Sequence, residues 1–158
     1  PPATTAKTRL MVIGQDKKSS FTALAEKLQV ASQVSFLGGR NDIPQFLLAA
    51  DVLVHPALDE AAGIILLEAV VAGLPVLVTD VCGYAHHIAR GESGIVLASP
   101  FDQNLYNKAL CSMLDRDQLQ RWQTSALAYA NSEDLYSMHS VGIDQIEALY
   151  QRRQGAGP

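Results

Sequence analysis

Short apolar runs alternate with amphipathic stretches along the first two thirds of the chain. The apolar runs are too short to do more than cross a core, and we expect strands at 8–14, 34–39, 51–56, 75–80 and 94–98. The intervening stretches repeat apolar residues at helical spacing, which predicts helices at 19–30, 41–51, 63–73 and 83–89. This alternation indicates a parallel sheet covered on both faces, that is, a doubly wound, Rossmann-like α/β domain.

The last third of the chain has only the helical pattern. We expect helices at 102–114, 116–130 and 133–153, so that the C-terminal helices occupy about 102–153. No internal repeat or low-complexity linker divides the sequence. We therefore expect one domain over residues 1–158.

Composition narrows the classes of function. The chain of 158 residues has a formal net charge of -4 and no run of Lys or Arg, which argues against a nucleic-acid partner. A phosphate site built from backbone amides stays possible. Cys82 and Cys111 form no C-x-x-C pair, so we expect two free thiols in a reducing compartment and no zinc site. The apolar tract 61–79 contains Glu68 and Pro75, and reads as a buried helix, turn and strand rather than a membrane span.

Glu68 is the single charged side chain between Ala61 and Thr79. Burying a lone carboxylate is costly unless it has partners, so Glu68 requires an explanation. Small residues precede it at the start of the expected helix, where free amides and the helix dipole favour an anion. A carboxylate about a turn and a half further along could accept hydrogen bonds from vicinal hydroxyls, as in a ribose.

A longer motif supports this interpretation. Glu60 and Glu68 form an E-x7-E pattern, followed by "AVVAGLPVLVTDVCGYAHHI", and together these resemble the C-terminal donor domain of family 4 of the GT-B glycosyltransferases. The stretch from "GGRNDIPQF" to "CGYAHHI" is most similar to the subgroup that transfers glucose to a heptose of the lipopolysaccharide inner core. The resemblance covers residues 8–150. It implies a retaining, metal-independent enzyme that needs no cofactor and uses UDP-glucose as donor.

The resemblance also implies roles for individual residues. Glu68 would hold the ribose diol, Glu60 would contact the donor sugar near the reacting carbon as the catalytic residue, and Arg40 would lie beside the base. Gly14 would belong to the donor site. The diphosphate would lie against the backbone amides of Ala62, Gly63 and Ile64.

Each of these residues also has a purely structural interpretation. Glu68 could be a buried carboxylate that caps a neighbouring loop, and Glu60 could be a charge at a helix N-terminus, worth under about 1 kcal/mol. Arg40 could belong to an ordinary turn with a solvated guanidinium. For three histidines near the expected site the structural interpretation is favoured: His55, His86 and His87.

The sequence departs from the family pattern in two respects. The family's domain begins with a strand and a loop whose Arg and Lys bind the diphosphate, whereas the first strand here matches the family's second. We therefore expect the C-terminal half of a two-domain enzyme that lacks its first, central strand and has strand edges left unpaired. Such a fragment should be inactive alone, poorly stable or oligomeric, and a weak UDP binder. His86 also stands where many members have an acidic residue.

Partners and location follow from the same resemblance. The lipopolysaccharide acceptor would bind the missing N-terminal domain, which could also place the cytoplasmic enzyme at the inner face of the inner membrane. Two other classes stay open: a sugar-nucleotide epimerase of the same architecture and a non-catalytic nucleotide-binding or interaction domain.

Overall fold

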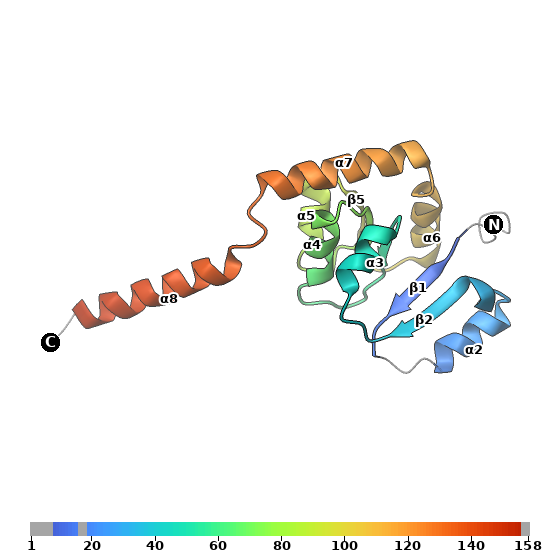
Figure 1. Cartoon of the computed structure of the whole chain (residues 1–158), viewed down its shortest axis with the longest axis horizontal. Coiled ribbons are helices and arrows are strands. Elements are labelled where there is room, and N and C mark those ends of the chain that lie inside the picture. Colours follow the sequence, from blue (N-terminus) through green and yellow to red (C-terminus); the bar gives the residue numbers. More distant parts are fainter. Residues whose placement is uncertain (1–7, 16–18, 156–158) are drawn as a thin grey trace. The chain divides into compact units, whose positions relative to one another are not determined.

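A computed structural model describes residues 8–15 and 19–155 (Figure 1). The chain consists of two compact units, Pro1–Ile43 and Pro44–Pro158. Each unit is considered by itself below. The expected strands and helices are present in both, which confirms the predicted mixed α/β class with parallel strands. The single domain over 1–158 stays a prediction.

The first unit is a small parallel β-α-β arrangement. Its elements are β1 (Leu10–Ile13), α2 (Ser19–Lys27), the 3-10 helix η1 (Ala31–Gln33) and β2 (Val34–Gly38). β1 pairs with β2 in register from Leu10↔Val34 to Val12↔Phe36, and the register shifts by one residue before Ile13. Of the apolar residues that predicted helix α2, only Ala25 is buried. A sheet of only two strands is too small to bury the remaining apolar side chains of this helix.

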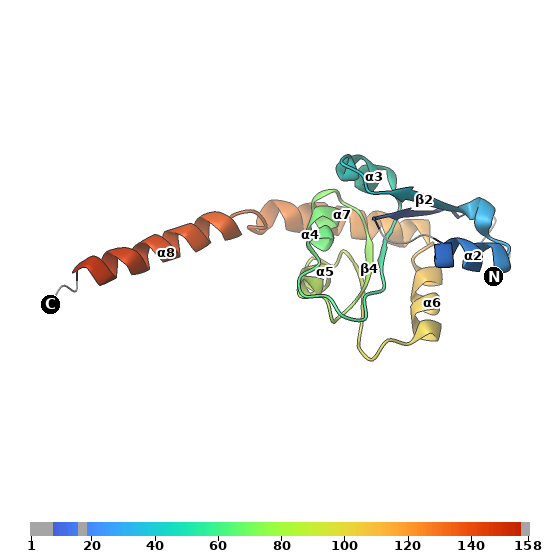
Figure 2. The same ribbon diagram turned by 90° about the horizontal axis from the view of Figure 1, so that it is seen from below.

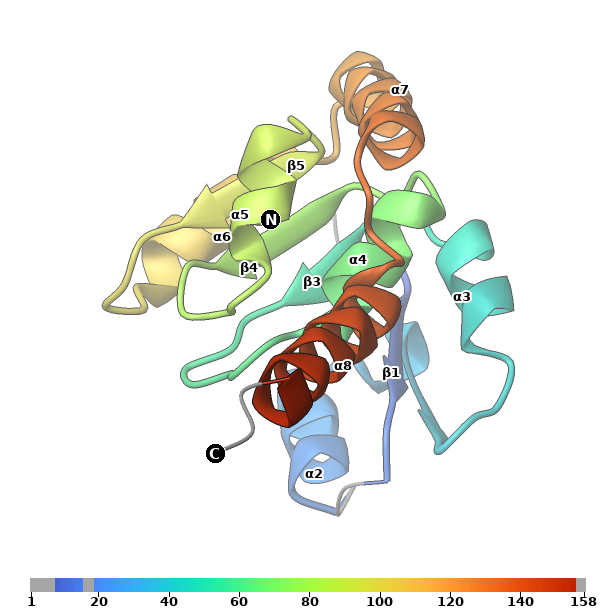
Figure 3. The ribbon, with the colours of Figure 1, turned by 90° about the vertical axis from the view of Figure 1, so that its left-hand side faces the viewer.

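The second unit contains the main core. Its strands are β3 (Leu53–His55), β4 (Val76–Thr79) and β5 (Gly94–Leu97), all parallel, with the fully buried β4 in the centre (Figure 3). Its helices are α3 (Ile43–Ala49), α4 (Ile64–Val71), α5 (Ala85–Arg90), α6 (Gln103–Ser112), α7 (Arg116–Ser132) and α8 (Met138–Gly155). α4 and α5 lie on one side of β4 and α6 lies on the other (Figure 2). An uninterrupted apolar strand covered on both faces is typical of the centre of a parallel sheet.

Tyr106 anchors α6 to this sheet. It is buried together with Leu77 and Met113, and its hydroxyl donates a hydrogen bond of 3.1 Å to the Leu77 carbonyl oxygen. Burial raises the pKa of the Tyr106 hydroxyl, so it stays a donor at any physiological pH.

We expect Tyr106→Phe to lower the free energy of unfolding by about 1 kcal/mol, because it removes this hydrogen bond and conserves the ring volume. Chemical denaturation of the wild-type and variant proteins would measure the loss. An unchanged midpoint would show that the bond contributes nothing net.

Close backbone approach fixes α7 on the helices before it. Gly73 has φ +68°, and a Cβ there would lie 2.9 Å from Cγ of Leu127 on α7. A Cβ on Gly91 would lie 2.9 Å from the Tyr129 ring, whose hydroxyl is 2.9 Å from Nδ1 of His87 on α5. Glycine at these two positions therefore lets α7 pack directly on the ends of α4 and α5.

One expectation about helix bounds differs from the structure. The last expected helix, 133–153, instead begins at Met138, and α7 continues to Ser132. The five strands form separate sheets, β1-β2 and β3-β4-β5, so that among the described strands β1 and β3 each have one neighbour. Among these strands, β1 and β3 thus have the unpaired edges that the sequence predicted. Whether a further segment or a second copy pairs with them stays a prediction.

Among the described residues, no helix is both long enough and apolar enough to span a membrane. α8 nonetheless exposes several large apolar side chains, those of Val141, Ile143, Ile146, Leu149 and Tyr150.

Candidate functional site

The second unit presents the candidate site where β3 and β4 end. Because these strands are parallel, the loops that follow them leave from the same edge of the sheet. The loop after β3 carries Glu60, and the loop after β4 runs from Asp80 to Tyr84. The two loops are joined by a bridge between Glu60 and Cys82 and by a 2.9 Å hydrogen bond from the Tyr84 amide to the Ala62 carbonyl oxygen.

The N-terminus of α4 lies at the end of the first of these loops. Gly63 occupies the N-cap position in the left-handed conformation, with φ 77° and ψ 54°, and among the described residues no side chain caps the helix. Glycine adopts this conformation without strain, whereas most residues do not. The first amides of α4 therefore lack a side-chain acceptor, which is the arrangement that binds anions.

Of the three amides expected to cradle a diphosphate, that of Ala62 has a partner. It donates a long hydrogen bond of 3.4 Å to Oε1 of Glu60. At that length the bond is weak, so an incoming phosphate oxygen could replace it. The amides of Gly63 and Ile64 are in the uncapped turn described above.

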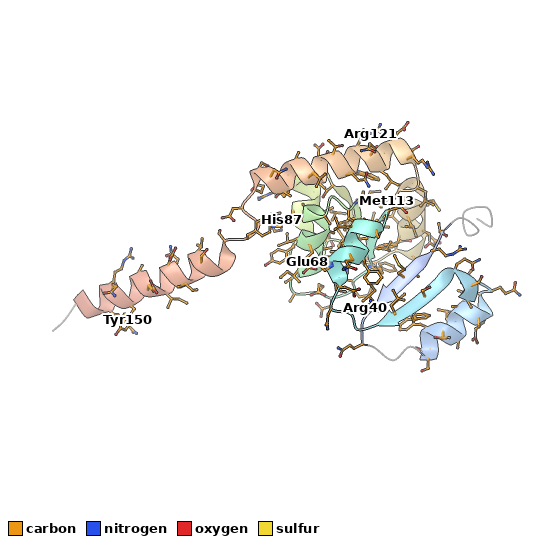
Figure 4. All side chains as sticks on the ribbon, in the orientation of Figure 1. Arg40, Glu68, His87, Met113, Arg121 and Tyr150 are labelled. Atoms are coloured by element: carbon orange, nitrogen blue, oxygen red, sulfur yellow. The ribbon has the colours of Figure 1, made fainter. Side chains whose placement is uncertain are left out.

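Glu68 is on α4 (Figure 4), and its side chain is exposed. Within the described residues its carboxylate has no ion-pair or hydrogen-bond partner, so the alternative of a buried structural carboxylate is wrong. The apolar sequence around Glu68 is explained by its neighbours, because Leu66, Ala69 and Val70 face the core. Successive helix residues are rotated by about 100°, which places Glu68 on a different face.

Glu68 borders a cavity of about 580 Å³ that is mainly apolar. Its walls come from α3, α4, α5 and the segment before α8. The lining residues are Pro44, Leu47, Leu48, Ile64, Leu67, Glu68, Val71, Ala72, Tyr84, His87, Asp134, Leu135 and Tyr136. A carboxylate at the edge of an apolar hollow can orient a ligand that has both a flat apolar part and hydroxyl groups.

Glu60 is partly exposed and faces His55 at the end of β3. Oε2 of Glu60 lies 4.0 Å from Nε2 of His55, and that nitrogen is buried and has no hydrogen-bond partner among the described residues. Burial, and then the charge of Glu60, raise the pKa of the Cys82 thiol. The neighbourhood of Glu60 is thus partly shielded from water, which strengthens its electrostatic interactions.

The remaining two predicted site residues belong to the first unit. Gly14 follows β1, its amide donates a 3.0 Å hydrogen bond to the Gly38 carbonyl oxygen, and the space around its Cα is open. Arg40 makes a bidentate pair with Asp42, with distances of 2.8 and 2.7 Å. This pairing raises the pKa of Arg40 and lowers that of Asp42. The roles of both residues in donor binding stay predictions.

Two of the histidines make contacts that fit a structural role. Nδ1 of His86 lies 2.8 Å from the Gly83 carbonyl oxygen, and the His86 and His87 rings lie 4.1 Å apart between centroids with their planes tilted by 37°. Nδ1 of His87 lies 2.9 Å from the Tyr129 hydroxyl. Burial, and then the neighbouring His86 and Arg90, lower the pKa of His87.

The sequence marked the loop after β4, "TDVCGY", as one of the unusual loops at the carboxyl edge of the sheet, but did not identify its contacts with the Glu60 loop. Thr79 and Gly83 contact the backbone of the Glu60 loop, as set out below, although they are more than twenty positions away from their partners at Ala57 and Ala61. The only local signal was the turn-like stretch "DVCGY", which indicates a loop but not its partner.

Comparison with known families places this geometry in context. Residues 2–151 match the family model "Glycosyl transferases group 1". The lipopolysaccharide glucosyltransferase WaaG of Escherichia coli is 52% identical over 140 residues, which are 88% of this chain and 37% of WaaG. The lipopolysaccharide core biosynthesis mannosyltransferase LpsB of Rhizobium meliloti is 31% identical over 70% of this chain and 32% of LpsB.

Solved structures agree with the fold. A crystal structure of WaaG superimposes with a TM-score of 0.88 at 49% identity, covering 92% of this chain and 40% of WaaG. The complex of HepE from Anabaena with UDP-glucose has a TM-score of 0.76 at 21% identity, covering 93% of this chain and 43% of HepE. The chain therefore spans about two fifths of the length of these structures.

Proposed function

Because the chain belongs to the group 1 glycosyl transferases, we propose that it is the donor-binding half of a retaining enzyme that transfers glucose from UDP-glucose to a heptose of the lipopolysaccharide inner core. The similarity to WaaG, which is named a lipopolysaccharide glucosyltransferase, supports the choice of sugar and acceptor. HepE, which was solved with UDP-glucose, supports the choice of donor through its fold alone.

The proposal rests on one observation, that α4 carries two groups suited to binding a nucleotide. Its N-terminus offers uncapped amides, and Glu68 on the same helix offers a carboxylate without a partner among the described residues. Glu68 lies four positions after Ile64 in the helix, a rise of about 6 Å. Helical side chains lean towards the N-terminus, so the carboxylate is directed towards the amides. One helix could thus bind both the diphosphate and the ribose diol of a nucleotide.

In the proposed reaction the bond between the anomeric carbon and the diphosphate oxygen breaks. A bond from that carbon to a heptose hydroxyl oxygen forms on the same face, and the hydroxyl proton leaves with the departing diphosphate. The amides of Ala62, Gly63 and Ile64 would stabilise the charge that develops on the diphosphate, the main catalytic contribution. Glu60 would contact the sugar near the reacting carbon.

The other parts of the proposal rest on the resemblance. Arg40 would turn from Asp42 to the base, and Gly14 would leave room for the donor. The reaction would need neither metal nor cofactor. The acceptor would bind the other half of the enzyme, which would act in the cytoplasm and could associate peripherally with the inner membrane.

The relatives named above do not favour the two alternatives. WaaG and LpsB are named a glucosyltransferase and a mannosyltransferase, whereas an epimerase would require a different acid and base pair. A non-catalytic interaction domain would not explain a carboxylate and an uncapped helix N-terminus on the same short helix.

A thermal-shift panel tests the proposal. We expect UDP-glucose to raise the melting temperature of the full-length protein more than GDP- or ADP-sugars do. A ligand at a hundred times its Kd adds about 2.7 kcal/mol to the stability of the folded state, so a specific donor is easily distinguished from a weak one.

The panel is run with and without EDTA, which should leave the UDP-glucose shift unchanged if no metal takes part. Equal shifts with all three nucleotides would contradict the assignment of the base. No shift with any nucleotide sugar would favour a non-catalytic domain, and release of free N-acetylhexosamine would favour an epimerase.

A further inference from the structure

The loop after β4 is built against the backbone of the loop that carries Glu60. The Thr79 hydroxyl donates a 2.6 Å hydrogen bond to the Ala57 carbonyl oxygen, and Thr79 is buried at the end of β4. Further along, the Tyr84 amide donates to the Ala62 carbonyl oxygen at 2.9 Å. These two bonds hold the Glu60 loop at both ends.

Gly83 lies between these two bonds and allows the closest approach. A Cβ built on Gly83 would overlap the Ala61 carbonyl oxygen and would lie 3.4 Å from the Ala62 Cα. The obstacle is backbone, which cannot swing aside as a flexible side chain can. The φ angle of Gly83 lies outside the left-handed region, so alanine would meet this overlap without additional backbone strain.

We propose that Gly83 is a positioning residue: its missing side chain lets the loop after β4 hold the Glu60 loop in the conformation that presents Glu60 and the amides of Ala62 and Gly63 to the donor. The proposal rests on the function proposed above and adds a residue that does not itself touch the donor. It separates the site into two parts, because Glu68 on the exposed face of α4 does not depend on this contact.

The separation has a measurable consequence. Displacing the Ala61 carbonyl group must move Ala62 and Gly63, which follow it in the chain, and disturb the diphosphate cradle. The Glu68 carboxylate, about a turn and a half into α4, is held by a helix whose other faces are buried. Ligands that contain phosphates should therefore be affected, and a ligand that has only a base and a ribose should not.

We expect Gly83→Ala to weaken UDP binding by about tenfold, the effect of losing one charge-assisted hydrogen bond, and to leave uridine binding unchanged. Isothermal titration calorimetry of the full-length protein with uridine, UDP and UDP-glucose would measure the three affinities. Amide chemical shifts of residues 61–63 would report the backbone displacement directly, without any ligand.

Gly91→Ala is the matched control. A Cβ there would also be crowded, although less closely than at Gly83, at 2.9 Å from the Tyr129 ring and 3.0 Å from the His87 carbonyl oxygen, and it would lie away from the Glu60 loop. It should lower the melting temperature without changing the ratio of UDP to uridine affinity. An equal loss of uridine and UDP affinity in Gly83→Ala would overturn the proposal, as would unchanged affinities and unchanged shifts at 61–63.

A second pair of variants applies if Gly83→Ala does not fold. Thr79→Val removes the hydrogen bond to Ala57 at nearly constant volume, and Thr79→Ser retains it. We expect Thr79→Val to lower the ratio of UDP to uridine affinity and Thr79→Ser to restore it; identical behaviour of the two variants would count against the proposal. If the wild-type protein binds no UDP, the proposed function fails, and the amide shifts still decide whether Gly83 positions the loop.

Discussion

Glu68→Gln in the full-length enzyme is expected to weaken binding of UDP and UDP-glucose by ten- to a hundredfold. The carboxylate would accept hydrogen bonds from both ribose hydroxyls, and a hydrogen bond to a charged group is worth roughly 1.5–3 kcal/mol. The exposed side chain has no partner among the described residues, so its replacement should not disturb the fold. Calorimetric titration with UDP measures the affinity, and thermal unfolding measures the stability.

Glu147→Gln is a suitable control, because Glu147 is also an exposed carboxylate on a helix, α8, and borders no part of the candidate site. It should bind UDP like the wild type. Wild-type affinity in Glu68→Gln would remove the ribose assignment. A large fall in melting temperature without a change in affinity would return Glu68 to a structural role.

The sequence predicted the second unit well because its signals are local. "PVLVTD" is an apolar run between a turn and a polar residue, and it forms the buried central strand β4. The pattern around Glu68 correctly predicted a helix closed at Gly73, whose φ of +68° suits a helix C-terminus. A strand such as β4, which is covered on both faces within its own unit, is uniformly apolar, so its burial can be read from its sequence.

Elements that depend on distant partners were predicted less well. The apolar positions of α2 correctly indicated a helix, yet Phe21, Leu24 and Leu28 are exposed. Apolar spacing identifies the face of a helix that would pack against a partner, but it does not show whether that partner is present. The pairing of a strand edge depends on its neighbours in space, which no pattern within the strand specifies.

The break between α7 and α8 has a local cause that the helical pattern concealed. The Asp134 side chain accepts hydrogen bonds from the amides of Tyr136 at 3.2 Å and Ser137 at 2.9 Å, and hydrogen bonding to Ser137 lowers its pKa. An Asp side chain that binds nearby amides competes with the helix for them. "SEDLYS" therefore ends one helix and begins another, rather than continuing either.

For the candidate site, residue type and spacing identified Glu60, Glu68 and the helix N-terminus between them. The mainly apolar sequence predicted a buried helix, yet Glu68 on that helix is exposed at the edge of a cavity, because a mainly apolar helix can still have one exposed face. The contact of Gly83 with Ala61 was not predictable from either segment alone. It arises because β3 and β4 are parallel neighbours whose loops leave from one edge of the sheet.

Glu60→Ala in the full-length enzyme is expected to lower kcat by about a hundredfold and to leave UDP affinity near the wild-type value. A preorganised charged group at the reacting centre typically contributes about 10²–10³ in rate, and it does so in the transition state rather than in the ground state. The hydrogen bond from the Ala62 amide to Glu60 is long, at 3.4 Å, so its loss should change the diphosphate cradle little. Steady-state release of UDP measures kcat, and calorimetry measures affinity.

Asp59→Ala provides the control, since Asp59 is an exposed acid in the same loop and should leave both quantities unchanged. It separates the effect of the Glu60 carboxylate from a general loss of negative charge near the diphosphate. If Glu60→Ala weakened UDP and UDP-glucose equally while kcat stayed constant, Glu60 would be a nucleotide ligand and not a sugar contact. If Asp59→Ala reproduced the loss in kcat, the effect would belong to the net charge of the loop, because a specific contact near the reacting carbon cannot be shared by an exposed neighbouring side chain.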